Sequence, residues 1–134
     1  MTRKEAREQA FLVLFQCNFF ADRAPEEILE NNLRNGSIKE NKFTNQLCSV
    51  VFKNMAEINS LIQKYSLNWE QDRITKVSLT ALRIAIAEIK YIEGIPIKVS
   101  LNEAIELTKK FANQEDALFV NGVLSGMVNE FPKD

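Results

Sequence analysis

FVNGVLSG, residues 119–126, is the stretch that decides whether the end of this chain is a hairpin or a helix. Asn121-Gly122 between apolar residues is a strong signal for a two-residue hairpin turn. The flanking residues, however, do not alternate between apolar and polar as the strands of a half-buried hairpin do. Apolar residues recur instead at helical spacing from Leu118 to Phe131. The stretch therefore predicts one helix that contains two glycines.

The two glycines of this predicted helix need a reason, because each costs about 1 kcal/mol relative to alanine. Gly122 and Gly126 are four residues apart and share one helix face. We expect another helix to pass Gly122 too closely for a side chain. At Gly126 two interpretations stay open, which are close packing and simple tolerance of an exposed glycine.

Helical periodicity fills the rest of the chain as well. Thr2 and Glu5 have the spacing of a capping box at the start of a helix of about five turns. Pro25 suits the first turn of a short second helix. A long third helix is expected from Phe43 to Tyr65.

The second half of the chain is expected to surround one buried helix. VSLTALRIAIAEIKYIEG, residues 77–94, is apolar nearly all round, as a central helix is. Ser100 and Glu103 have capping-box spacing for the next helix, and Asp116 is the expected N-cap of the last one.

These elements predict an all-α fold of two small helical bundles. Residues 1–65 form the expected N-terminal helical subdomain, and residues 66–134 form the C-terminal one, together making one compact domain. Trp69 and Arg73 are expected to anchor one subdomain on the other. Arg83, within the apolar helix, should be buried and therefore paired, with Glu103 and Glu106 as candidate partners.

Composition and charge exclude several classes of protein. The chain has 134 residues, of which 46% are hydrophobic and 26% charged, as in ordinary globular domains. A formal net charge of −1 argues against nonspecific coating of nucleic acid but permits a small local RNA contact. No apolar run is long enough to span a membrane, and MTRKEAREQ does not start a signal peptide. We therefore expect a cytoplasmic protein that does not contact a membrane.

The side chains that commonly carry catalysis are scarce. There is no histidine, and Cys17 and Cys48 lie among apolar residues, as buried reduced thiols do. Four soft ligands for zinc cannot be assembled from this set. Paired carboxylates such as Glu26-Glu27 fall at expected helix starts, where the helix dipole favours them. We therefore expect no enzymatic activity, no metal and no cofactor.

Several longer motifs occur in a distinctive order. They are WEQDRI from residue 69, LRIAIAE from residue 82, IPIKVSLNEAIELTKKF from residue 95 and FVNGVL from residue 119. Together with the opening TRKEAREQAFLVLFQ, they resemble the NusB family of bacterial transcription antitermination factors. The resemblance implies two helical bundles packed side by side. It also implies binding to boxA, a short single-stranded RNA element in the leader of ribosomal RNA operons.

The resemblance also implies protein partners. The first is NusE, a ribosomal small-subunit protein that doubles as a transcription factor. NusE, RNA and a family member dock onto RNA polymerase together with NusA and NusG. Homodimers occur in some members. A dimer of this chain would hide Arg3 and Arg7, a hypothesis motivated by a phenylalanine-rich first helix that exceeds what one core can bury.

By the same resemblance, the family's basic N-terminal patch corresponds to Arg3, Lys4 and Arg7. Arg3 and Arg7 are one turn apart, so both can meet one stretch of phosphates. Phosphate contacts of this kind supply affinity and register but little sequence information. The alternative is an ordinary solvated face, on which Glu5 and Glu8 cancel part of the charge.

The resemblance places a second group of RNA-binding residues late in the chain. Phe119 matches an aromatic position near the RNA, where a ring can stack on an unpaired base. Its alternative role is core packing. Lys109 and Lys110 would extend the basic track, or they are ordinary cations near a helix C-terminus.

The chain departs from the family pattern in ways that affect both interactions. Its first helix has fewer arginines than is usual, and Phe15 replaces a tyrosine. Ser78 and Leu79 stand where many members have charged residues, including one linked to NusE contact, so the residues that bind NusE are not assigned. We expect an RNA-binding adaptor, and the alternative is a helical protein–protein interaction scaffold without direct RNA contact.

Overall fold

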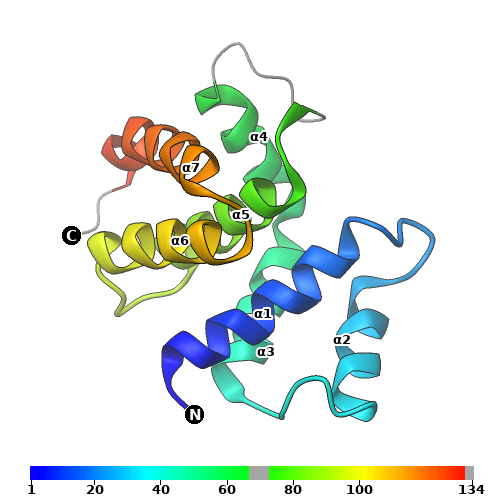
Figure 1. Cartoon of the computed structure of the whole chain (residues 1–134). Coiled ribbons are helices and arrows are strands. Elements are labelled where there is room, and N and C mark those ends of the chain that lie inside the picture. Colours follow the sequence, from blue (N-terminus) through cyan, green and yellow to red (C-terminus); the bar gives the residue numbers. More distant parts are fainter. Residues whose placement is uncertain (67–72, 132–134) are drawn as a thin grey trace. The chain divides into compact units, whose positions relative to one another are not determined.

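The computed structural model describes residues 1–66 and 73–131, and Figure 1 shows its course. The described residues form helices joined by turns and contain no strand, which confirms the all-α prediction. The chain divides into two compact units, Met1–Lys53 (unit 1) and Asn54–Asp134 (unit 2). No helix in the described ranges combines the length and apolar character needed to cross a bilayer.

Unit 1 contains α1 (Arg3–Cys17), α2 (Pro25–Arg34) and α3 (Lys42–Lys53). Helix α1 packs against both α2 and α3. The buried residues of α1 recur three or four residues apart, so they lie on one face of the helix, as the sequence predicts. The buried apolar residues of α1 and α3 are Ala6, Ala10, Phe11, Val13, Leu14, Leu47, Cys48 and Val51.

Hydrogen bonds hold the start of α3 against α1. The buried hydroxyl of Thr44 donates to the carbonyl oxygen of Ala6 at 3.0 Å. The Gln9 amide accepts from the backbone N–H of Lys39 at 2.7 Å and donates to the carbonyl of Lys39 at 3.0 Å. The loop before α3 is therefore tied to the second turn of α1.

Unit 2 contains α4 (Met55–Tyr65), α5 (Lys76–Tyr91), α6 (Ile97–Phe111) and α7 (Gln114–Met127), followed by the short 3-10 helix η2 (Val128–Glu130). Helix α5 packs against α4, α6 and α7, so the prediction of a buried central helix is confirmed. Its one fully buried carboxylate is Glu88, which accepts a hydrogen bond from the hydroxyl of Ser100 in α6 at 2.9 Å.

The expected long third helix is wrong, because it is two helices. Asn54 separates α3 from α4 with a non-helical backbone at φ −120° and ψ 21°. Asparagine favours such breaks because its side chain competes for backbone hydrogen bonds. The compact units also divide at Asn54, whereas the sequence placed the boundary after residue 65. The reason is that α4 packs on α5 and α7.

Two predicted caps are wrong. Helix α6 begins at Ile97, directly after Pro96, so Ser100 lies inside the helix. Its hydroxyl donates a hydrogen bond to Glu88 and takes no part in a capping box. At α7, the N-cap is Asn113, whose side chain accepts from the backbone N–H of Asp116 at 2.8 Å. Asp116 lies in the first turn, where its charge still suits the helix dipole.

Helix α7 runs through the FVNGVLSG stretch, which confirms the helical interpretation. The expected close packing at Gly122 is wrong, because a Cβ there would meet no described atom within 4 Å. A Cβ at Gly126 would make ordinary contact with the Tyr65 ring at 3.7 Å. Both glycines are exposed, so the described surroundings exclude no side chain at either position.

The open space at Gly122 leads to a prediction about stability. Gly122→Ala should raise the free energy of unfolding by about 0.5–1 kcal/mol, because alanine loses less backbone entropy in a helix. Gly36→Ala is the contrasting variant, since Gly36 has φ +82° and alanine is strained there. Urea unfolding of both variants checks this expectation. A lower stability for Gly122→Ala would contradict it.

The start of α1 leads to a prediction about pH. The Thr2 N–H donates to the Glu5 carboxylate at 2.8 Å, and the Thr2 hydroxyl accepts from the Glu5 N–H at 3.1 Å, so the predicted capping box is confirmed. The hydrogen bond from the Thr2 backbone lowers the pKa of Glu5 most, and the hydrogen bond of the Thr2 side chain lowers it further. The box therefore stabilises the fold above the pKa of Glu5 in the unfolded chain, and this stabilisation is lost as pH falls through the lowered pKa.

Replacing the capping side chain should be visible at Glu5 itself. In Thr2→Ala, the pKa of Glu5 should rise toward its ordinary value, because the hydroxyl contribution is gone. A carbon-detected NMR titration of the Glu5 carboxyl in the wild type and the variant measures this change. An identical pKa in both proteins would show that the hydroxyl does not act on the carboxylate.

Candidate nucleic-acid interface

The guanidinium groups of Arg3 and Arg7 both lie over the ring of Phe43. The Cζ atom of Arg3 is 4.6 Å from the ring centroid, and that of Arg7 is 5.4 Å from it. One helical turn separates the two arginines on α1, so one ring at the start of α3 reaches both. Both distances lie within the range of a cation–π attraction.

The three predicted basic residues of α1 differ in accessibility. Arg3 and Lys4 are exposed, whereas Arg7 is only 3% exposed. Arg7 follows the buried Ala6 on the face of α1 that meets α3, and sequence reasoning treated all three residues alike. The exposed cations of this site are therefore Arg3 and Lys4, and the phosphate role of Arg7 stays a prediction.

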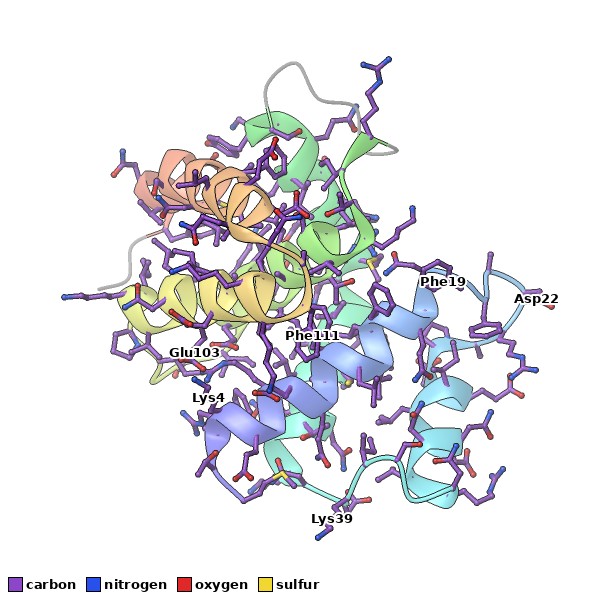
Figure 2. The ribbon with its side chains drawn as sticks, viewed as in Figure 1. Lys4, Phe19, Asp22, Lys39, Glu103 and Phe111 are labelled. Atoms are coloured by element: carbon purple, nitrogen blue, oxygen red, sulfur yellow. The ribbon has the colours of Figure 1, made fainter. Side chains whose placement is uncertain are left out.

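Further cations lie near this end of unit 1. Lys39 projects outward from the loop before α3 (Figure 2), and Lys42 is exposed at the first position of α3. Sequence reasoning named neither residue as part of a site. The signal that could have found them is their spacing on both sides of Asn41, directly before the aromatic Phe43.

The two predicted lysines of unit 2 lie in the last turn of α6 and are exposed. Lys109 is 4.0 Å from the carboxylate of Glu106, a long ion pair on the surface that contributes little. The Lys110 ammonium lies 5.4 Å from the ring centroid of Phe111, an exposed aromatic residue labelled in Figure 2. These lysines also suit the negative end of the helix dipole.

Phe119 is half-buried in α7, so its ring is neither a full member of the core nor fully open to solvent. The adjacent Leu118 is the exposed apolar residue of this helix, at 62%. Base stacking and packing therefore both stay open for Phe119.

The structural roles expected for other motif residues are partly revised. Arg83 is half-buried rather than buried, and its Nε–H donates to the side-chain oxygen of Asn59 at 3.0 Å. The sequence did not indicate Asn59, because it belongs to a helix that was assigned to the other subdomain. Arg73 is exposed, and Trp69 lies outside the described residues.

The aromatic residues at the end of α1 are partly exposed. Phe11 is buried and stacks on Phe15 with ring centroids 5.9 Å apart. Phe15 meets Phe19 edge-on with ring centroids 5.2 Å apart. Phe19 is 57% exposed, and Phe20 is exposed as well. The expectation that these rings exceed what one core can bury therefore agrees with the burial.

Both thiols of the chain are free. Cys48 is buried and Cys17 is half-buried, as expected for reduced cysteines at or near a core. Burial and the neighbouring Cys17 raise the pKa of Cys48 to about 12, so it is protonated at neutral pH and a poor nucleophile. In residues 1–66 and 73–131, no three metal-ligating side chains are placed to hold an ion.

Known proteins that are similar to this chain bear on the meaning of this geometry. The sequence profile of the NusB family matches residues 4–129. The chain is 41% identical to the transcription antitermination protein NusB of Agathobacter rectalis over 128 residues, which cover 93% of this chain and 98% of that protein. It is 38% identical to the protein of that name from Listeria innocua, over 97% of this chain and 98% of the relative.

Solved structures show the same fold. A NusB structure from T. maritima superposes with a TM-score of 0.88 at 30% identity, covering 98% of this chain and 93% of that one. A crystal structure of the antitermination factors NusB and NusE in complex with double-stranded RNA matches with a TM-score of 0.85 at 29% identity. That match covers 96% of this chain and 97% of the solved one. The fold, the profile match and the near-complete coverage of these relatives show that this chain belongs to the NusB family, a family of transcription antitermination factors and not of enzymes.

Proposed function

We propose that this protein binds the boxA RNA of ribosomal RNA operons together with NusE and thereby acts in transcription antitermination. The observation that carries the proposal is the pair of exposed cations, Arg3 and Lys4, at the start of α1. In the described part of the chain, neither takes part in an ion pair. Both are therefore available to phosphates, which is what a backbone-binding site requires.

The similar complex of NusB and NusE with RNA supports this proposal, since it combines both partner classes on a related chain. In unit 2, Lys109 and Lys110 supply further exposed positive charge, and the half-buried Phe119 offers part of a ring for base stacking. Stacking of one base contributes about 1–3 kcal/mol. These residues extend the proposal to both units without requiring any particular arrangement of the two.

The modest number of exposed cations favours assembly over strong binding of RNA alone. Each partner orders surface that the other then binds at a lower entropic cost, so the ternary complex is tighter than either pair. The proposed function further includes docking of this complex onto RNA polymerase, together with NusA and NusG, in the cytoplasm. A homodimer formed through exposed rings such as Phe19 would compete with this assembly.

Fluorescence anisotropy of a labelled single-stranded boxA RNA tests the proposal, with and without NusE and at two salt concentrations. We expect salt-dependent binding that NusE strengthens. In Arg3→Ala/Lys4→Ala, the slope of log affinity against log salt should become shallower by about 0.7 for each lost phosphate contact. Arg23→Ala/Lys53→Ala removes two other exposed cations of unit 1 and serves as the charge-matched control.

The outcomes separate the two functions that the sequence left open. Loss of binding in the α1 variant, with the control unchanged, supports RNA binding through the start of α1. Binding of NusE with no response to RNA in the wild-type protein would contradict the proposal and favour the scaffold without RNA contact.

A further inference from the structure

A pocket of about 420 Å³ opens within unit 1 between the start of α1 and the start of α3. Among the residues that line it are Thr2, Arg3, Asn41, Lys42, Phe43 and Gln46. The pocket thus joins one of the exposed cations proposed to contact phosphate with residues that neither the sequence motifs nor the family resemblance assign to RNA binding.

Lys42 and Gln46 are four residues apart and share one face of α3. Both side chains are exposed, and among the described residues neither forms a hydrogen bond or an ion pair. Lys42 therefore offers a free ammonium group. Gln46 offers both a donor and an acceptor, which is the combination needed to read the edge of a base.

The charge around the pocket is positive although the chain as a whole is slightly acidic. In residues 1–8 and 39–46, five lysines and arginines stand against three glutamates. The Glu5 carboxylate is held by the N–H of Thr2, and Glu40 accepts a hydrogen bond from the Asn45 amide. These neutral donors leave both carboxylates charged, but the described residues that line the pocket include the cations Arg3 and Lys42 and no acidic side chain, which suits a phosphate group rather than another cation.

The pocket is also held in shape before any ligand arrives. The hydroxyl of Thr44 ties α3 to the carbonyl of Ala6, and Gln9 holds the backbone of Lys39. Phe43 attracts the guanidinium groups of Arg3 and Arg7. A site ordered in advance loses less entropy when it binds.

We propose that this pocket receives one nucleotide of the single-stranded RNA. Lys42 and Arg3 contact its phosphates, and Gln46 hydrogen-bonds to the edge of its base. Phe43 is a positioning residue, because it acts by holding Arg3 in place. This inference rests on the proposed function, and it extends the RNA interface from α1 onto α3.

The first test compares the two ends of α3. Lys42→Ala should weaken binding of boxA RNA about tenfold, since it removes a hydrogen bond to a charged group, and should reduce the salt slope by about 0.7. Lys53→Ala is the matched control, because Lys53 is an exposed lysine at the other end of the same helix. Gln46→Ala in the same titration should weaken binding without changing the salt slope.

The second test concerns the aromatic ring. Phe43→Leu should weaken RNA binding about two- to fivefold for each guanidinium group that it releases. Phe43→Tyr should bind RNA like the wild type, because a tyrosine ring attracts a guanidinium group and a leucine side chain does not. Phe52→Leu, at another half-buried ring of α3, controls for general loss of packing. Exchange broadening of the Arg3 side-chain N–H signal in NMR, without RNA, reports directly whether the leucine variant frees this group.

The outcomes keep the inference separate from the function on which it rests. If the wild-type protein with NusE does not bind RNA, both are overturned. If Arg3→Ala/Lys4→Ala weakens binding but Lys42→Ala behaves like Lys53→Ala, the function stands and the pocket is not a nucleotide site. If Phe43→Leu and Phe43→Tyr lose binding equally, Phe43 does not act through the arginines. If an acidic peptide binds the pocket and boxA RNA does not, the ligand class is wrong.

Discussion

The hydrogen bond from the buried Thr44 hydroxyl to the Ala6 carbonyl is the contact on which the geometry of the candidate site depends. Thr44 is fully buried where the two helices meet, and its hydroxyl also accepts a hydrogen bond from the Gln9 amide at 3.2 Å, whereas the apolar side chains around it would by themselves permit sliding. A buried hydroxyl without a partner costs about 1–3 kcal/mol, so this contact favours the observed register of α3 on α1. In that register, Phe43 comes under Arg3 and Arg7, and the loop before α3 reaches Gln9.

Unit 2 uses the same principle with a carboxyl group. Glu88 is fully buried on α5 and accepts from the Ser100 hydroxyl on α6. A buried carboxyl group that lacks hydrogen-bond partners is more costly than a misplaced apolar residue, so this contact favours one alignment of the two helices. That alignment carries Lys109 and Lys110 at the far end of α6, well away from Ser100 along the helix.

The sequence was informative at several places where local chemistry decides the structure. The capping box of Thr2 and Glu5, the helical period through Gly122 and the apolar character of α5 all act within a few residues. Contacts between residues that are far apart in the sequence could not be predicted from it. The burial of Arg7 depends on α3 covering one face of α1, and no pattern within α1 shows this.

The misplaced helix boundaries have a related cause. Asn54 interrupts a period that reads as continuous, because the apolar residues of α3 and α4 happen to stay in phase across the break. Ser100 and Glu103 have the spacing of a cap, yet Pro96 starts the helix one turn earlier. At Asn54 the continuous period hid a local break, and at Pro96 one local signal, the proline, prevailed over another, the capping-box spacing. For the candidate site, the resemblance supplied α1, the end of α6 and Phe119. The grouping of Lys42 and Gln46 with Arg3 became visible when α3 was placed beside α1.

The near-zero charge of the chain constrains how such a site can find RNA. With a formal net charge of −1, the protein as a whole offers no long-range attraction to phosphates. At physiological ionic strength, attraction by the cations of unit 1 extends only about 8 Å. Capture must therefore depend on contact with a local site that is already in position. In the proposed assembly, the order that Phe43 imposes on Arg3 therefore matters more than the number of cations, and a partner that lengthened the lifetime of the complex would have a physical role.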